Sequence, residues 1–221
     1  MFFYLSMTDT LLLQGQRHVL VKQLATQYPF APEVLQAMDR VPRHFFVEDG
    51  LQHLAYKDKP LPIAAKQTIS QPYTVAMQTH LLACKKWDKV LEVGTGCGYQ
   101  TAVLLALNYK VYSIERIRTL FLQAQKNLLA IGFPANGISY GDGFAGLPLF
   151  APFDGILVTC GAPEIPQTLL RQLAVGGRMV VPVGTKTQRM LRITRTAEAR
   201  FETEDFGDYQ FVPMLEGTQA N

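Results

Sequence analysis

The chain has 221 residues, of which 48% are hydrophobic and 18% are charged. This is ordinary globular composition, and it excludes an intrinsically disordered protein. The length is sufficient for one domain with a sizeable core and too short for two comfortable ones. The formal net charge of +3 is too small to require a nucleic-acid partner, although it would tolerate an anionic substrate.

The three cysteines, Cys84, Cys97 and Cys160, form no closely spaced, even-numbered set of the kind that indicates a disulfide framework. The apolar start of the chain carries no basic residue before its short run, which argues against a secretory signal. No stretch approaches the roughly 18 to 20 uninterrupted apolar residues of a membrane span. We therefore expect a monomeric cytoplasmic protein with no membrane partner. Whether residues 1–6 are native or Met7 is the initiator stays open.

Apolar residues at helical spacing predict helices over residues 11–28 and 32–40, with proline breaks between them. The following stretch to Gln71 is irregular, and Pro60 and Pro62 hold it in an extended path. A third helix is predicted to begin near Ser70, with Pro72 in its first turn.

From Trp87 onward, short strands alternate with helices. The sequence predicts strands at 89–93, 110–114, 138–140, 155–159 and 178–183, and helices at 99–107, 117–131 and 166–174. This order predicts a doubly wound, Rossmann-like α/β sheet covered on both faces. The last forty residues alternate with a period of two, which predicts a hairpin that closes one edge in antiparallel fashion. We expect a single domain over 1–221, with N-terminal helices to residue 86 and the Rossmann-like core from residue 87.

Ligands of such sheets bind at the carboxyl ends of the strands, and a glycine loop lies at the first of these ends. Gly94, Gly96 and Gly98 allow a sharp turn and a close approach of the backbone to a ligand. Dinucleotide enzymes use a related spacing. Here, however, Glu92 precedes the loop, and its charge would repel a pyrophosphate but favour a ligand with an ammonium and a sulfonium group. A turn that serves only strand–helix packing is the alternative.

Two further acidic residues follow the next strands. Glu115 ends the second core strand, where a carboxylate can accept hydrogen bonds from both hydroxyls of a ribose. A solvated glutamate is the alternative. Arg116, which follows directly, could bind a 2′-phosphate, so a dinucleotide cofactor with that group stays possible. Asp142, between Gly141 and Gly143, suits a bend at an adenine edge, although a simple Asp-Gly turn has the same sequence. Together with the glycine loop, these residues favour S-adenosyl-L-methionine as the cofactor.

Several motifs resemble the protein-L-isoaspartate(D-aspartate) O-methyltransferase family, and the resemblance extends over nearly the whole chain. Beside the glycine loop and Gly141-Asp142-Gly143, they are Val41-Pro42-Arg43, Asp58-Lys59-Pro60-Leu61-Pro62-Ile63, Gln67-Thr68-Ile69-Ser70-Gln71-Pro72-Tyr73, Ala151-Pro152-Phe153-Asp154, Val181-Pro182-Val183-Gly184 and Phe211-Val212-Pro213. The Thr-Ile-Ser-x-Pro element, Val-Pro-Arg and the late Val-Pro pair are specific to this family.

The resemblance implies a methyltransferase sheet of seven strands and transfer of a methyl group to the α-carboxylate of L-isoaspartyl residues in damaged proteins. The products would be a methyl ester and S-adenosyl-L-homocysteine, and no metal is implied. Ser70 matches the active-site serine, and Ser70, Val212 and Pro213 match positions near the peptide. The matching cofactor positions, some in the segment over cofactor and substrate, are Thr68, Ile69, Ser70, Val75, Glu92, Gly94, Thr95, Gly96, Glu115, Asp142 and Gly143.

The sequence departs from the family in two places. Ala64-Ala65-Lys66 stands where relatives commonly have glycines, which could stiffen the segment before Ser70. Cys97 replaces a more usual serine in the glycine loop, and we expect it only to pack.

The implied reaction requires placement more than proton transfer. An α-carboxylate has a pKa near ~3.5, so it is ionised at neutral pH and needs no general base. The four histidines are accordingly expected to pack or to lie on the surface: His18, His44, His53 and His80. Ser70 could donate a hydrogen bond to the acceptor carboxylate, or it could cap the helix that contains Pro72.

Other functions stay open from the residues alone. They are a methyltransferase for a small molecule or nucleic acid, a nicotinamide dehydrogenase, and a non-catalytic module that binds the cofactor. The late arginines could attract an anionic partner, but such a set more often forms a solvated sheet edge: Arg189, Arg192, Arg195 and Arg200.

Overall fold

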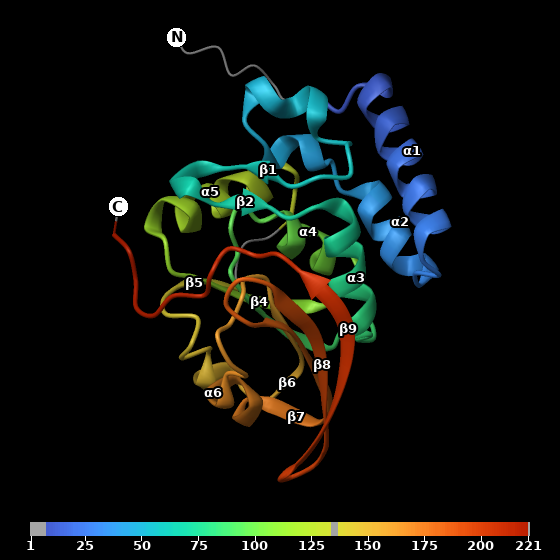
Figure 1. Cartoon of the computed structure of the whole chain (residues 1–221). Coiled ribbons are helices and arrows are strands. Elements are labelled where there is room, and N and C mark those ends of the chain that lie inside the picture. Colours follow the sequence, from blue (N-terminus) through green and yellow to red (C-terminus); the bar gives the residue numbers. More distant parts are fainter. Residues whose placement is uncertain (1–7, 134–136, 221) are drawn as a thin grey trace.

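The computed structural model describes residues 8–133 and 137–220 (Figure 1). The expectations about residues 1–6 and Met7 therefore lie outside the described residues. The N-terminal part consists of helices, 3₁₀ turns and one short strand pair, in the order α1 (Leu11–Gln27), α2 (Pro32–Arg40), η1 (Arg43–Phe46), η2 (Asp49–Leu54), β1 (Leu61–Pro62), η3 (Ala64–Lys66), β2 (Thr68–Ile69) and α3 (Pro72–Leu82). The three predicted helices are confirmed, and α3 begins just after Ser70.

A seven-stranded sheet follows, with the strand order β5-β4-β3-β6-β7-β8-β9. Its strands are β3 (Lys89–Val93), β4 (Lys110–Glu115), β5 (Ile138–Tyr140), β6 (Phe153–Val158), β7 (Leu173–Val183), β8 (Gln188–Ala197) and β9 (Arg200–Tyr209). Strands β3 to β7 pair in parallel, whereas β8 and β9 form an antiparallel hairpin beside β7. The predicted α/β sheet and its antiparallel edge are confirmed.

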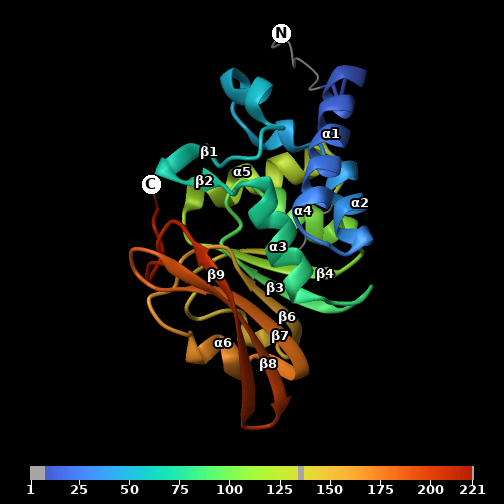
Figure 2. The same cartoon turned by 45° about the vertical axis from the view of Figure 1, so that its right-hand side comes forward.

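Helices cover both faces of this sheet, but unevenly. Val90, Leu157 and Val180 pack in the apolar cluster that includes α1 to α4, α5 (Arg118–Ala130) and β8, with α4 spanning Tyr99–Ala106. Their chain neighbours Leu91 and Ile156 belong to a second cluster with α6 (Gln167–Arg171). Figure 2 shows α6 on the side of the sheet opposite α1 to α5. One apolar cluster thus reaches from α1 to β8, and the single domain over 1–221 stays a prediction.

The prediction of a helix over 166–174 is wrong at its C-terminal end. The helix α6 ends at Arg171, and β7 begins two residues later because Leu173 pairs with Phe153 of β6. The main-chain N–H of Phe153 also donates to Gln172 O (2.8 Å). Tertiary pairing with the sheet therefore overrides the helical spacing of the apolar residues here.

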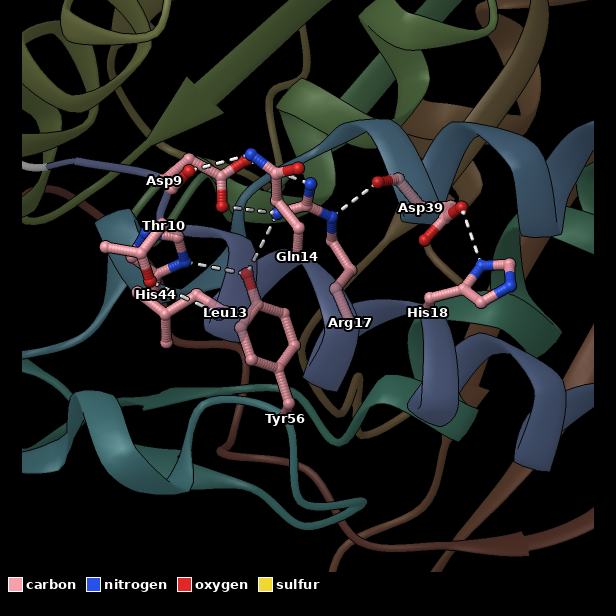
Figure 3. A network of polar contacts seen from close by, with 9 residues as sticks. All are labelled: Asp9, Thr10, Leu13, Gln14, Arg17, His18, Asp39, His44 and Tyr56. Atoms are coloured by element: carbon pink, nitrogen blue, oxygen red, sulfur yellow. Dashed lines mark hydrogen bonds and ion pairs between the residues drawn. The ribbon is translucent and has the colours of Figure 1, made fainter.

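A partly buried polar network fixes the N-terminal helices to the turns that follow them (Figure 3). Both carboxylate oxygens of Asp9 accept from the Arg17 guanidinium at 3.0 Å, and Arg17 also donates to Tyr56 Oη (3.2 Å) and to the carbonyl of Asp39. The Tyr56 hydroxyl lies 2.7 Å from His44 Nδ1. Burial lowers the pKa of His44, which favours its neutral form in this network.

The other histidines also have structural surroundings. His80 Nδ1 accepts from the main-chain N–H of Ala31 (3.1 Å), His18 lies 3.3 Å from Asp39, and His53 is exposed. Packing and surface roles were predicted for all four histidines. No helix within 8–133 and 137–220 has the length and hydropathy needed to span a bilayer.

Candidate active site

The carboxyl ends of β3, β4 and β6 open into a cavity, which we call the first cavity. Its walls come from the glycine loop, from residues around Glu115, from the segment 67–70 and from the late segment 212–215. Eleven predicted site residues line it: Thr68, Ile69, Ser70, Val75, Gly94, Thr95, Gly96, Glu115, Gly143, Val212 and Pro213. The structure thus brings together motifs that lie up to 145 positions apart in the chain (213 − 68).

The glycine loop is pressed closely against the neighbouring strand end. Gly94 has a φ of +98°, a region that side-chain-bearing residues rarely adopt. A Cβ atom at this position would lie 2.5 Å from Thr159 Oγ1. The Thr159 hydroxyl, at the end of β6, is 2.5 Å from Gly94 O and 3.0 Å from Val93 O. Gly94 is therefore required both by backbone conformation and by space.

Glu115 joins the end of β4 to the glycine loop. Its Oε2 accepts from Gly96 N (2.8 Å) and its Oε1 accepts from Ile117 N (2.9 Å). Burial raises the pKa of this carboxyl group, and the main-chain donors and Arg116 oppose the rise. Each carboxylate oxygen has a further lone pair, so a residue that lines the cavity can accept additional donors from a ligand.

Glu92 lies behind the cavity wall. Its side chain is fully buried (0% exposed), and its Oε2 accepts from Thr101 Oγ1 (2.5 Å) and Ser113 Oγ (2.7 Å). Oε1 has no hydrogen-bond partner among the described residues. Burial raises the pKa of Glu92 to about 7. Since Ser113 also contacts the Thr95 hydroxyl (2.6 Å), Glu92 braces the loop from below, and a direct contact with the cofactor stays a prediction.

Asp142 also lies outside the cavity lining. Its side chain binds main-chain N–H groups. Its Oδ1 accepts from Phe144 N (2.9 Å) and its Oδ2 from Gly217 N (2.8 Å). Arg116 donates to the same late segment, at Gly217 O (3.2 Å) and Gln219 Oε1 (3.3 Å). The two side chains hold the segment that carries Met214 and Leu215 against the first cavity. Arg116 is thus engaged by the chain itself, which weakens the interpretation that it binds a 2′-phosphate.

Ser70 is not a helix cap. The helix α3 has Gln71 at its N-cap position with no side-chain cap, and Asp58 instead accepts from Tyr73 N (2.8 Å) and Gln71 Nε2 (3.1 Å). The cap alternative is therefore wrong, because a carboxylate from another segment already satisfies the first turn. Within the described part of the chain, the Ser70 hydroxyl has no hydrogen-bond partner and is available to a ligand.

A second cavity, of about 740 Å³, adjoins the first. The two cavities share Thr68, Ser70, Thr159 and Val212, so these residues mark the junction between them. Aromatic residues from α3 and from the end of the chain form much of the second cavity: Tyr73, Phe206, Tyr209 and Phe211. Of the residues predicted near a peptide, Ser70 and Val212 line both cavities and Pro213 lines the first.

The late arginines make ion pairs and hydrogen bonds along the edge hairpin. Arg189 pairs with Asp205 (2.8 Å) and Asp208 (3.0 Å), and Arg192 pairs with Glu204 (2.7 Å). Arg195 donates to main-chain carbonyls, and Arg200 lies 3.8 Å from Glu202. These contacts agree with a solvated sheet edge and leave no concentrated basic surface on these strands.

The lining of the first cavity fits S-adenosyl-L-methionine. A carboxylate that already accepts main-chain N–H groups suits a ribose diol, and the glycine loop leaves its backbone open to a ligand. Ile117, Leu120 and Leu215 add an apolar wall suited to a purine ring. Among the described residues, no group of three or more His, Cys, Asp or Glu side chains could hold a metal ion.

Several lining residues were not predicted from the sequence. They are Gln100 on the first turn of α4, and Met214 and Leu215 in the late segment. The position of Gln100, two residues after the last glycine of the loop, is a local signal that could have identified it. Met214 and Leu215 reach the cavity only through the tertiary contacts of the late segment.

The sheet order and the cavity at its strand ends are those expected of an S-adenosyl-L-methionine-dependent methyltransferase. A sequence model of the family described as protein-L-isoaspartate(D-aspartate) O-methyltransferase matches residues 15–219. The chain therefore belongs to this family.

Similar proteins agree with this assignment. Protein-L-isoaspartate O-methyltransferase of Christiangramia forsetii is 51% identical over 210 residues, covering 95% of this chain and 99% of the relative. The protein of the same name from Flavobacterium psychrophilum is 50% identical, with the same coverage.

Solved structures show the same fold. A structure named protein-L-isoaspartate O-methyltransferase is 28% identical, with a TM-score of 0.80 over 89% of this chain and 65% of that one. A putative enzyme of this kind from Plasmodium falciparum, in complex with S-adenosyl-L-homocysteine, is 22% identical. Its TM-score is 0.78, and the match covers 90% of this chain and 98% of that one.

Proposed function

We propose that this chain is a protein repair methyltransferase that methylates the α-carboxylate of L-isoaspartyl residues in damaged proteins, with Ser70 at the acceptor. The observation that carries the proposal is the position of Ser70. Its hydroxyl has no partner among the described residues, and it lies at the junction of a cavity suited to the cofactor and a cavity large enough for a peptide. Family membership over residues 15–219 supports the acceptor.

The cofactor, when bound, supplies an electrophilic methyl group. Glu115 would accept from the ribose hydroxyls, and the backbone of Gly94 and Gly96 would lie close to the cofactor. Thr68, Ile69 and Val75, which also line the cavity, would cover it. The predicted cofactor contacts of Glu92 and Asp142 are indirect in this scheme, because Glu92 braces the loop and Asp142 holds the late segment.

At the junction, the Ser70 hydroxyl would donate to one oxygen of the acceptor carboxylate and so hold the other oxygen in position for methyl transfer. The acceptor needs no general base, because an α-carboxylate is ionised at neutral pH. Fixing two reactants in one orientation can lower a barrier by about 7–11 kcal/mol in favourable cases. Val212 and Pro213 then contact the peptide near the acceptor.

We further propose that the enzyme is a cytoplasmic monomer that binds no nucleic acid. The described cysteines are free, as in a reducing compartment, and the late arginines are paired within the chain. Size-exclusion chromatography with light scattering tests the oligomeric state. A dimer at micromolar concentration would contradict the proposed monomer.

The acceptor is tested with matched peptides. The enzyme is incubated with methyl-labelled S-adenosyl-L-methionine and with two peptides that differ only in an isoaspartyl or an aspartyl residue. We expect label on the isoaspartyl peptide alone, and we expect mild alkali to release it because the product is a methyl ester. Label on neither peptide would overturn the proposal, and alkali-stable label on a nucleic acid or small molecule would favour another methyltransferase function.

A further inference from the structure

The edge hairpin contains a β-bulge beside the second cavity. Arg189 of β8 pairs with Asp208 of β9, whereas Leu191 pairs with Asp205, so β9 has one residue more than β8 between the two pairs. Gly207 lies in this stretch with a φ of +89°, which residues with a side chain rarely adopt. Bulges of this kind occur next to active sites, where they redirect side chains.

The bulge interrupts the regular alternation of side chains along β9. Successive side chains of a regular strand point to opposite faces of the sheet. Here Asp208 and Tyr209 are neighbours in the chain, yet both line the second cavity, and Phe206 on the other side of Gly207 lines it as well. The bulge therefore brings a carboxylate into a wall that also carries aromatic rings.

Among the described residues that line the second cavity, Asp208 is the only Asp, Glu, Lys, Arg or His. Its Oδ1 pairs with Arg189 Nη1 (3.0 Å), and the same guanidinium pairs with Asp205 through Nε (2.8 Å). Two carboxylates thus share one guanidinium, which leaves this group of three side chains with one surplus negative charge. Asp208 Oδ2 has no hydrogen-bond partner in the described part of the chain, and the side chain is 64% exposed.

The other groups that line the second cavity are suited to the same kind of ligand. Tyr73, Tyr209 and Phe211 add aromatic rings, whose faces attract an ammonium or guanidinium group. Lys59 and Lys186 are chain neighbours of lining residues, but neither of them lines the cavity. The cavity wall therefore offers an anion and aromatic rings, and no cation, to a side chain that enters it.

We propose that Asp208 is a specificity-determining residue that favours isoaspartyl peptides with a lysine or arginine within two positions of the isoaspartyl residue. Ser70 and Asp208 line the same cavity, so the side chain that reaches Asp208 belongs to a near neighbour of the acceptor. A basic side chain pairs with the surplus charge, whereas an acidic one is repelled by it. The inference rests on the proposed function, because it specifies the flanking sequence of the proposed peptide substrate.

The test compares isoaspartyl peptides that differ at one flanking position. Lysine, its uncharged analogue norleucine, and glutamate are placed in turn at each of the two positions before and after the isoaspartyl residue. For the wild type we expect kcat/KM at one or more positions to be about threefold to tenfold higher with lysine than with norleucine, the gain from an exposed ion pair and a cation–π contact. Glutamate should give a lower value than norleucine.

Asp208→Asn removes the charge and keeps the shape of the side chain. It should reduce the ratio of lysine to norleucine to less than half of its wild-type value. The reduction should appear in KM and not in kcat, because the ion pair forms when the peptide binds. Higher ionic strength should lower the ratio in the wild type and have little effect on it in Asp208→Asn, since salt screens an exposed pair.

Glu204→Gln is the matched control. Glu204 is also a carboxylate of β9 that pairs with an arginine (Arg192, 2.7 Å), and its side chain is 50% exposed, but it lines neither cavity. This variant should keep the wild-type ratio, and an equal loss in Glu204→Gln and Asp208→Asn would contradict a specific role of Asp208.

The outcomes separate this inference from the proposed function. If lysine, norleucine and glutamate give equal kcat/KM at every position, or if Asp208→Asn keeps the wild-type ratio, the role of Asp208 is overturned and the proposed function stands. If the wild type methylates none of the isoaspartyl peptides, the proposed function itself is overturned, and the flanking preference with it.

Discussion

The two sides of the first cavity are built in different ways. On the sheet side, Gly94, Glu115 and Thr159 stand at the ends of paired parallel strands. The Thr159 hydroxyl donates to Gly94 O, and the Glu115 carboxylate accepts from Gly96 N. On the covering side, Ser70 follows a strand pair in which each strand has only two residues. The turn η3 within this pair has left-handed backbone at Ala65 and Lys66.

This difference separates the two tasks of the enzyme. The sheet side presents groups that need only be fixed in place to bind the cofactor, and it resembles other doubly wound proteins. The covering side carries the Ser70 hydroxyl and the motif specific to the family, and few hydrogen bonds hold it. We infer that changes on the sheet side alter cofactor affinity, whereas changes on the covering side alter turnover and the stability of the cover.

The largest effect is expected for Glu115→Gln on the sheet side. The amide cannot accept from Gly96 N with its nitrogen, and it loses the charge that strengthens the bonds to the ribose hydroxyls. We expect the affinity for S-adenosyl-L-homocysteine to fall by about a hundredfold or more, which corresponds to two charge-assisted hydrogen bonds. Calorimetric titration measures this loss. The exposed Glu164→Gln is the control, and equal affinity of both variants would contradict the role of Glu115.

A second prediction concerns the pH dependence of stability, through Glu92. Because its pKa is raised to about 7 in the folded state from 4.5, its contribution to stability is fully present below pH 4.5. That contribution is lost as the pH rises through about 7. The side chain of Glu92→Gln stays neutral. At pH 8 the free energy of unfolding of this variant should therefore exceed that of the wild type by on the order of 2–3 kcal/mol.

Urea denaturation at pH 5 and pH 8 measures this difference. The gap between Glu92→Gln and the wild type should be wide at pH 8 and narrow at pH 5. A gap that is the same at both pH values would show that Glu92 is already ionised in the folded protein at pH 5. The sheet side would then tolerate a buried charge beneath the loop.

Ser70→Ala tests the covering side. We expect kcat to fall by about tenfold to a hundredfold, since one hydrogen bond to the charged acceptor is lost. The Kd of S-adenosyl-L-homocysteine should be unchanged, because the sheet side holds the cofactor. Steady-state kinetics with an isoaspartyl peptide measures the first quantity and calorimetry the second. Wild-type kinetics in a folded variant would remove Ser70 from the active site.

The same contrast explains which parts of the site the sequence predicts. The glycine loop and Glu115 are predictable because each follows a strand with a clear apolar pattern, and parallel strands end at one edge. The position of Glu92 follows from strand parity, since it shares a face with Val90 and therefore points under α4 toward Thr101. The sequence shows that a carboxylate precedes the glycine loop, but it does not show on which face of the sheet α4 packs.

The covering side is less predictable for a physical reason. Whether Ser70 caps α3 depends on Asp58, a residue from another segment, and this contact exists only in the folded chain. The same holds for Met214 and Leu215, which are placed by the contacts of Arg116 and Asp142 with the late segment. Only the resemblance to the family connects these segments to the site before the fold is known.

The smallest expected effect tests the backbone strain in η3, the turn that leads to Ser70. Ala65 has φ 55° and ψ 31°, a left-handed conformation that costs a residue with a side chain about 1–2 kcal/mol. Ala65→Gly removes this cost, and part of the gain is offset by the greater freedom of glycine in the unfolded chain. We expect the free energy of unfolding to rise by about 0.5–1 kcal/mol, as measured by urea denaturation.

Ala64→Gly is the matched control, because Ala64 is not among the residues with positive φ. This substitution brings the entropic cost of glycine without any relief, so it should lower the free energy of unfolding by about 0.5–1 kcal/mol. Opposite signs for the two variants would place stored strain in the turn that leads to Ser70. If both variants lose stability to the same extent, the cover is unstrained, and the contrast between the two sides of the cavity is limited to their hydrogen bonding.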